Sequence, residues 1–123
     1  MGIADNLIGI KEKIPGHVRL VAVSKTKSDE EIMEAYDAGH RDFGENKVQD
    51  LVAKQERLPK DIRWHMIGHL QSNKVKYLAS FVHMLHGVDG LKLLGIIDKE
   101  AGKHGRVIDC LLQVRIAREE SKF

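Results

Sequence analysis

The chain has 123 residues, 42% of them hydrophobic and 31% charged, and its formal net charge at pH 7 is +2. This composition predicts one soluble domain over residues 1–123, and scattered basic residues with a small net charge argue against a nucleic-acid partner. No apolar stretch is long enough to span a membrane and there is a single cysteine, Cys110, so we expect a cytoplasmic protein without disulfides or membrane partners.

The first third of the chain predicts a helix, a strand and a second helix. Apolar residues at helical spacing predict a helix over 3–14, which Pro15 and Gly16 end. A near-continuous apolar run predicts a buried parallel strand over 18–24. Ser28 and Glu31 have the spacing of a capping box, so a helix is expected over 29–38, with Gly39 after its end.

The same strand-then-helix unit continues to the end of the chain. Strands are predicted at 41–43, 63–67, 83–88 and 107–116, and helices at 46–57, at 71–79 and from Asp89, as the cap, to about 103. This alternation predicts an α/β fold with a parallel sheet. The pattern leaves two architectures open, an open doubly wound sheet and part of a (β/α)8 barrel. In both, the carboxyl ends of the strands lie along one edge.

Lys25 lies at the point where the first strand ends and a short loop leads to a helix. Ligands of α/β folds bind at this edge of the sheet. Burial of a lysine there favours its neutral amine, which is a nucleophile toward aldehydes. The alternative is an ordinary solvated loop lysine, the expectation for Lys27 two positions later.

Two residues after the second predicted strand allow more than one role. Asn46 and Gln49 have capping-box spacing, so Asn46 could cap the next helix or contact a ligand. Glu45 is expected to be a solvated or salt-bridged carboxylate, with a general base as the alternative.

The histidines do not form a recognisable metal motif in the sequence. His65 and His69 are four residues apart, but this spacing suits a metal only on a helix, and here one lies in a strand. His83 and His86 are expected on opposite faces of their strand, so no metal site is predicted. No P-loop and no GxGxxG motif is present. Cys110 is expected to be an inert core residue.

Four strings together resemble the pyridoxal-phosphate homeostasis protein family, part of the alanine racemase N-terminal domain superfamily. In chain order they are Val21-Ala22-Val23-Ser24-Lys25-Thr26-Lys27, Phe43-Gly44-Glu45-Asn46, Trp64-His65-Met66-Ile67-Gly68-His69-Leu70-Gln71-Ser72-Asn73-Lys74, and Cys110-Leu111-Leu112-Gln113-Val114 with Glu119-Glu120-Ser121-Lys122. The match covers nearly the whole chain, and four strings in order are much more specific than one.

The resemblance implies a fold type III barrel, that is, a TIM-type barrel that binds pyridoxal 5′-phosphate. It also implies that Lys25 forms the internal aldimine with this cofactor, and that Asn46 and Met66 line the cofactor pocket. The family binds the cofactor to buffer or deliver it and has no established turnover, so the protein is expected not to be an enzyme.

Three positions depart from the family pattern. Gly87 replaces a serine of the fourth-strand motif, and Arg115 at the end of the fifth strand and Arg118 beyond it stand where the family has an asparagine and a glycine. Arg115 either contacts the cofactor phosphate or fills the site.

The length of the chain and the order of the strings suit the N-terminal half of such a barrel, over residues 1–123. A complete barrel needs about 200–250 residues, and about five strands are predicted here. The first and fifth strands would have open edges, which invite pairing with another chain. We therefore expect a half-barrel completed as a homo-oligomer.

Three functional hypotheses follow. The first is a non-enzymatic pyridoxal-phosphate carrier, and the second is a self-assembling half-barrel scaffold that has lost useful cofactor binding. The third is an enzyme of racemase or decarboxylase type, which lacks a visible second domain or tyrosine partner.

Overall fold

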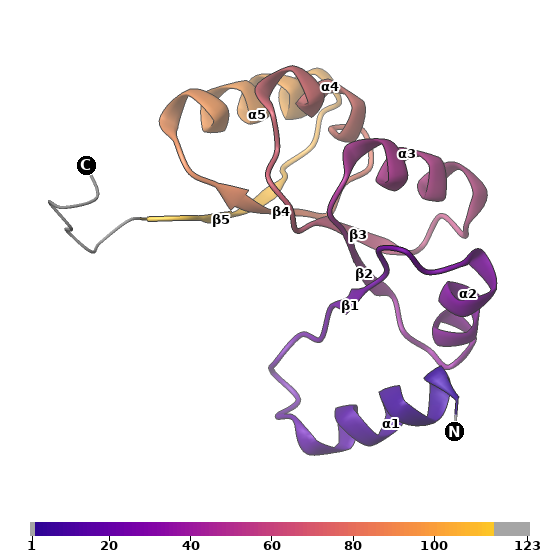
Figure 1. Cartoon of the computed structure of the whole chain (residues 1–123). Coiled ribbons are helices and arrows are strands. Elements are labelled where there is room, and N and C mark those ends of the chain that lie inside the picture. The colour runs from indigo at the N-terminus through magenta and orange to yellow at the C-terminus, as the bar shows by residue number, and fades with distance from the viewer. Residues whose placement is uncertain (1, 115–123) are drawn as a thin grey trace, which may run out of the picture.

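The computed structural model describes residues 2–114, which form one parallel sheet with helices packed against it (Figure 1). The elements are α1 (Ile3–Lys13), β1 (Ala22–Val23), α2 (Asp29–Asp37), β2 (Asp42–Glu45), α3 (Val48–Arg57), β3 (Arg63–Met66), a 3-10 turn η1 (Ser72–Lys74), α4 (Val75–Leu78), β4 (Met84–Val88), α5 (Leu91–Lys103) and β5 (Asp109–Leu112). None of these helices has the length and hydrophobicity that a membrane crossing requires.

The order of the strands decides between the two architectures that the sequence left open. The five strands are all parallel and lie in the sheet in the order β1-β2-β3-β4-β5. Helices α2 to α5 follow the outer, convex side of this curved sheet (Figure 1). A doubly wound sheet reverses its strand order and carries helices on both faces, whereas a barrel adds each strand beside the last. The prediction of barrel-type (β/α) units is confirmed.

Helix starts follow the sequence at one position and depart from it at two. Ser28 and Glu31 form the predicted capping box at the start of α2. At α3, however, the cap residue is Lys47, so Asn46 and Gln49 do not form the capping box that their spacing suggested. At α5 the cap is Gly90, not Asp89, and no side chain caps the helix.

The two outer strands are shorter than predicted. The run at 18–24 forms strand only at Ala22–Val23, and the described part of the last run, residues 107–114, only at Asp109–Leu112. Within the described chain each of these strands has a hydrogen-bonded neighbour on one side only, so less of each run is held in the ladder. Cys110 on β5 is half-buried and packs against the hydrophobic core from its margin.

The two faces of the sheet have different roles, which the strand register defines. Phe43 pairs with Trp64 and Glu45 with Met66, and these side chains point to the helices and are buried. Asp42 and His65 lie on the other, concave face, which helices α2 to α5 leave uncovered (Figure 1). The core therefore lies between the sheet and its outer helices, and concave-face residues are available for other contacts.

Strand β4 departs from strict alternation. Its register against β5 shifts between Leu85 and Val88, and both of these side chains are buried. Since two residues three apart would alternate in a regular strand, the bulge lets both reach the core. It also places Gly87 at the carboxyl end of the strand, beside Gly68 of the preceding loop.

Candidate functional site

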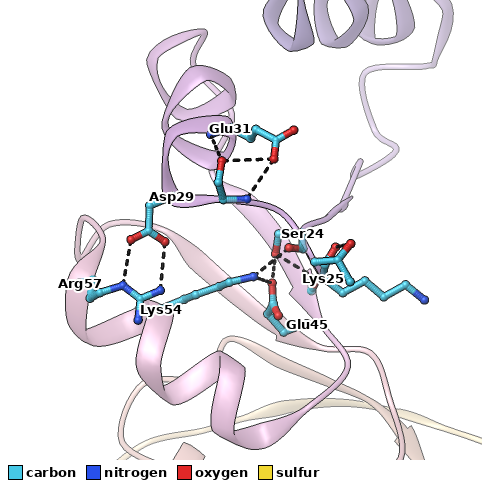
Figure 2. A network of polar contacts seen from close by, with 10 residues as sticks. Ser24, Lys25, Asp29, Glu31, Glu45, Lys54 and Arg57 are labelled. Carbon is cyan, nitrogen blue, oxygen red and sulfur yellow. Dashed lines mark hydrogen bonds and ion pairs between the residues drawn. The ribbon is translucent and has the colours of Figure 1, made fainter.

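Lys25 is presented at the tip of a tight turn at the carboxyl end of β1. The backbone amide of Lys27 donates to the carbonyl of Ser24 at 3.1 Å, which makes Lys25 and Thr26 the two central residues of the turn. Figure 2 shows the Lys25 side chain extending away from the polar network beneath the turn. Lys25 is exposed, so the described residues do not supply the burial that was expected to favour its neutral amine.

A buried polar network fixes the turn from below (Figure 2). The amide of Ser24 donates to the carbonyl of Gly44 at 2.9 Å, and its hydroxyl donates to the Glu45 carboxylate. Lys54 of α3 donates from Nζ to the carbonyl of Ser24 at 2.9 Å and to Glu45 Oε2 at 2.8 Å. Ser24, Glu45 and Lys54 are all buried, so this network ties the backbone just before Lys25 to both β2 and α3.

Thr26 stores backbone strain within the same turn. Its φ is +62°, a left-handed conformation that a β-branched residue rarely adopts, and its hydroxyl donates to the carbonyl of Lys25 at 2.5 Å. Such a conformation costs on the order of 1–3 kcal/mol and persists only when the surroundings impose it. The turn that contains Thr26 is closed by the hydrogen bond from Lys27 to Ser24, and Ser24 is in turn fixed by the buried network.

The neighbouring strand ends pack very closely at the same edge of the sheet. A Cβ on Gly68 would lie 2.5 Å from the carbonyl oxygen of Asn46, which no side chain can satisfy without a backbone shift. A Cβ on Gly44 would lie 3.0 Å from Ile67, on the concave face next to β1. Glycine at these two positions thus allows the loops after β2 and β3, and the side chains of Ile67 and Val21, to pack closely at this edge of the sheet. Asn46 itself is half-buried and makes no helix cap.

Two cavities lie at opposite edges of the sheet. One of about 430 Å³ lies at the edge where β2 and β3 begin, and one of about 530 Å³ lies beside Asn46, where β2 ends. The larger cavity is lined by Asn46, His69, Lys74 and Tyr77 among others, and Lys25 does not line it. Lys47 and Lys74 give its rim positive charge. Of the three predicted site residues that lie within residues 2–114, Asn46 borders this cavity and Lys25 and Met66 do not.

The other two predicted site residues have different outcomes. Met66 is 1% exposed and lies in the hydrophobic core on the helix-facing side of β3, so its role as a pocket residue stays a prediction. Arg115, like Arg118, lies outside the described residues. Glu45 is confirmed as a salt-bridged carboxylate, and its partner is Lys54. The local sequence around Lys54 did not indicate this ion pair, because the pair forms only when α3 folds back over β2.

The structure also brings together residues that the sequence kept apart. Asp42, His65 and His83 place their side-chain ligand atoms within 4.8 Å of one another on the concave face. His83 precedes β4, and its ring centroid lies 5.4 Å from that of His65, while His86 hydrogen-bonds to His65 at 2.9 Å. The prediction that His83 and His86 lie on opposite faces of the strand is wrong, because both rings contact His65. His83 precedes Met84, the first paired residue of β4, so strand alternation does not apply to it.

The electrostatics of this cluster favour neutral imidazoles beside an ionised carboxylate. Burial lowers the pKa of His65 and of His83 below the ordinary value of 6.5. Burial alone would raise the pKa of Asp42, but hydrogen bonds from Arg63 and His65 lower it to about 2. The cluster therefore holds one negative charge at neutral pH, next to the cation of Arg63.

Comparison with known proteins connects these features to one family. No protein-family model matches the chain. The pyridoxal phosphate homeostasis protein of Helicobacter pylori (strain 26695) is 49% identical over 109 residues, which is 85% of this chain and 48% of that protein. The proteins of this name from Aquifex aeolicus and Escherichia coli K12 are 43% and 37% identical and cover 85% and 98% of this chain. The chain is a relative of the pyridoxal phosphate homeostasis proteins.

Solved structures of PipY from Synechococcus elongatus agree with this assignment. The structure without pyridoxal phosphate has a TM-score of 0.88 at 40% identity and covers 96% of this chain and 56% of PipY. The structure with pyridoxal phosphate bound has a TM-score of 0.87 at 42% identity. PipY is a TIM-type barrel, and this chain corresponds to about half of it. The chain likewise spans 46–48% of the first two curated relatives and 57% of the Escherichia coli one.

The residues of this relative of the pyridoxal phosphate homeostasis proteins fit the cofactor in chemical type. Lys25 supplies a primary amine for an aldehyde, and Asn46 supplies a carboxamide at the next strand end. The close approach that Gly68 allows is the second observation in favour, because it packs the loop after β3 against the backbone of Asn46, where a Cβ would lie 2.5 Å from the Asn46 carbonyl oxygen. The names of the relatives specify homeostasis and mention no catalysed reaction.

Proposed function

We propose that the chain binds pyridoxal 5′-phosphate through Lys25 as a carrier and does not turn it over. The observation that carries the proposal is the anchored turn: the buried Ser24–Glu45–Lys54 network and the strained Thr26 together hold Lys25 at the carboxyl edge of the sheet. The relatives named for pyridoxal phosphate homeostasis and the PipY structure with the cofactor bound support it.

The chemistry required of the chain is limited. The Lys25 amine adds to the cofactor's aldehyde carbon and water leaves, which forms a C=N bond. The turn fixes the backbone from which this amine extends, so the side chain samples a smaller region than it would on a free loop. Asn46 at the neighbouring strand end is positioned to accept or donate a hydrogen bond. Within residues 2–114 we assign no group to the phosphate; Arg115 remains our candidate for it from the sequence.

Reductive trapping tests this proposal directly. The chain is incubated with pyridoxal 5′-phosphate and borohydride, and the adduct is located by mass spectrometry of its peptides. We expect one adduct at Lys25 that Lys25→Ala abolishes, whereas Lys27→Ala, a change at an exposed lysine two residues away, retains it. Scattered labelling of many lysines would support the scaffold hypothesis instead, and racemisation of an amino acid by the loaded chain would support an enzyme.

We also propose that the 123-residue chain associates with copies of itself. In the described residues β1 and β5 have neighbours on one side only, and Leu111, Leu112 and Val114 at the β5 edge are 49%, 59% and 70% exposed. An apolar groove of about 360 Å³ between α1, β1 and α2 adds to the surface that a second copy could cover. Open strand edges with apolar side chains are pairing sites.

Light scattering on the purified chain tests this association. We expect a dimer or larger species at micromolar concentration. Leu112→Lys places a charge on the open edge and should shift the population toward monomer, whereas Leu91→Lys changes an 85% exposed leucine on α5 and should not. A monomeric wild-type chain would contradict the proposal. The cytoplasmic location and the lack of nucleic-acid and membrane partners stay predictions.

A further inference from the structure

A compact group of metal-ligating side chains lies on the concave face of the sheet. Asp42 begins β2, His65 lies within β3, and His83 is the residue just before β4, the next strand of the sheet. Their ligand atoms all lie within 4.8 Å of one another, and the Asp42 Oδ1 to His65 Nε2 distance is 3.0 Å. Metal ligands around one ion are separated by about 3–3.5 Å, given metal–ligand bonds of about 2.0–2.2 Å.

Hydrogen bonds from neighbouring side chains orient the ligand groups of this cluster, as the outer partners of a metal site do. The ionised Asp42 carboxylate only accepts, so His65 donates from Nε2 to Asp42 Oδ1 at 3.0 Å and accepts at Nδ1 from His86 Nε2 at 2.9 Å. With a metal ion on Nε2, the proton would move to Nδ1 and the same contact would be donated to His86. Arg63 donates to both oxygens of Asp42, at 3.0 and 2.8 Å, and keeps that carboxylate ionised and oriented. Such hydrogen bonds to the rear of ligating groups fix their orientation.

A cation already occupies the position between the carboxylate and the outer histidine. Arg19, in the loop before β1, donates from Nη1 to His83 Nε2 at 2.7 Å, and its Nε lies 4.0 Å from Asp42 Oδ1. This pair of contacts means that the lone pairs of His83 and Asp42 converge on a positive group. Arg19 has a side chain that is 49% exposed and lies outside any helix or strand, so it can leave at little cost.

We propose that Asp42, His65 and His83 bind one divalent transition-metal ion in the place of the Arg19 guanidinium. Two imidazole nitrogens and one carboxylate oxygen are the ligand set of Zn²⁺, Ni²⁺ or Fe²⁺ sites, whereas Mg²⁺ and Ca²⁺ prefer oxygen ligands throughout. Three protein ligands leave room for water at the ion. The site lies on the concave face near the amino ends of β2 and β4, distinct from Lys25 at the carboxyl edge, and it does not depend on the proposed cofactor function.

Metal titration of the full 123-residue chain, without a histidine tag and stripped with EDTA, tests the proposal. Zn²⁺ binding is measured by calorimetry, and Co²⁺ is used as a spectroscopic probe because its absorption reports nitrogen and oxygen ligands. We expect one ion per chain. His83→Gln should weaken Zn²⁺ binding by about tenfold or more, since it removes a ligand. His104→Gln changes an exposed histidine at the end of α5 and should leave the affinity unchanged.

Arg19→Gln provides the sharper test, because the proposal predicts a gain. Removing the competing guanidinium should tighten Zn²⁺ binding several-fold, whereas a purely structural polar network would bind no metal in either form. Arg19 and His83 are both at least partly accessible, and circular dichroism confirms that each variant folds. Failure of the wild-type chain to bind Zn²⁺, equal affinity in His83→Gln, or weaker binding in Arg19→Gln would each overturn the assignment.

Discussion

Lys54 Nζ lies 2.8 Å from Glu45 Oε2 in the interior of the molecule, beneath the turn that carries Lys25. The second oxygen of Glu45, Oε1, is buried and has no hydrogen-bond partner among the described residues, so the carboxylate depends on Lys54 and Ser24. Lys54 also donates to the carbonyl of Ser24 and therefore couples the charge of Glu45 to the backbone of the turn. One buried ion pair thus supports both the fold of β1 against α3 and the placement of Lys25.

Lys54→Ala should destabilise the chain strongly. The substitution leaves the Glu45 carboxylate buried without its cation, which costs about 3–5 kcal/mol when one partner of a buried pair is removed. Urea unfolding followed by circular dichroism measures the loss. Lys92→Ala, at an exposed position of α5, is the control and should change the free energy of unfolding by less than about 0.5 kcal/mol. Equal, small effects of both substitutions would show that the pair is not a structural element.

Gly68→Ala and Gly87→Ala should differ sharply although both add one methyl group. At Gly68 the new Cβ would lie 2.5 Å from the carbonyl oxygen of Asn46, a backbone atom that cannot move aside alone. We expect a loss of about 2–3 kcal/mol, as for overpacking of an interior. At Gly87 the nearest atom would be 3.4 Å away, which is an ordinary contact, so that variant should be close to wild type.

Thermal unfolding of the two glycine variants decides this point. The same reasoning predicts that Gly87→Ser, which introduces the residue that the family resemblance associates with this position, folds normally. A destabilised Gly87→Ser beside a normal Gly68→Ala would contradict the observed packing of the strand ends.

Thr26→Gly should stabilise the folded chain. Glycine adopts φ of +62° without steric cost, so the strain of about 1–3 kcal/mol is relieved, against an entropic cost of about 0.5–1 kcal/mol for glycine in the unfolded state. We expect a net gain of about 1 kcal/mol in chemical denaturation. Thr26→Ala keeps the strained conformation and removes the hydroxyl that bonds to the Lys25 carbonyl, so it should not gain stability.

Stability should fall with acidification in two windows. Burial lowers the folded-state pKa of four histidines, His40, His65, His83 and His86. Below the ordinary value of 6.5, the unfolded chain therefore binds more protons than the folded chain does. The contribution of these histidines to the free energy of unfolding is therefore fully present above pH 6.5 and is lost as the pH falls below it. Asp42, with its pKa lowered from 3.8 to about 2, contributes about 2 kcal/mol that is present above pH 4 and lost between pH 4 and 2.

Urea midpoints measured across this range test the assignment of each window. In Asp42→Asn the loss between pH 4 and 2 should become smaller, while the loss that begins below pH 6.5 should persist. If Asp42→Asn instead left the low-pH window unchanged, carboxylates other than Asp42 would account for it.

Local patterns in the sequence determined the identity and order of the elements. The capping box of Ser28 and Glu31 needs residues three apart only, and the Pro15-Gly16 break acts on its own neighbours, so both could be recognised without a fold. The same holds for Lys25, whose place after an apolar run marked the carboxyl edge of the sheet. The alternation of strands and helices predicted a parallel sheet because parallel strands need crossover connections.

Tertiary structure decided what depends on contacts between distant segments. The strand order selected the barrel-type sheet, and the fold of α3 over β2 paired Lys54 with Glu45, nine residues apart. Asp42, His65 and His83 come together only because β2, β3 and the segment that leads into β4 lie side by side in the sheet. Sequence spacing could not reveal either group, since hydrogen bonding and coordination act through space, whereas periodicity describes only neighbours along the chain.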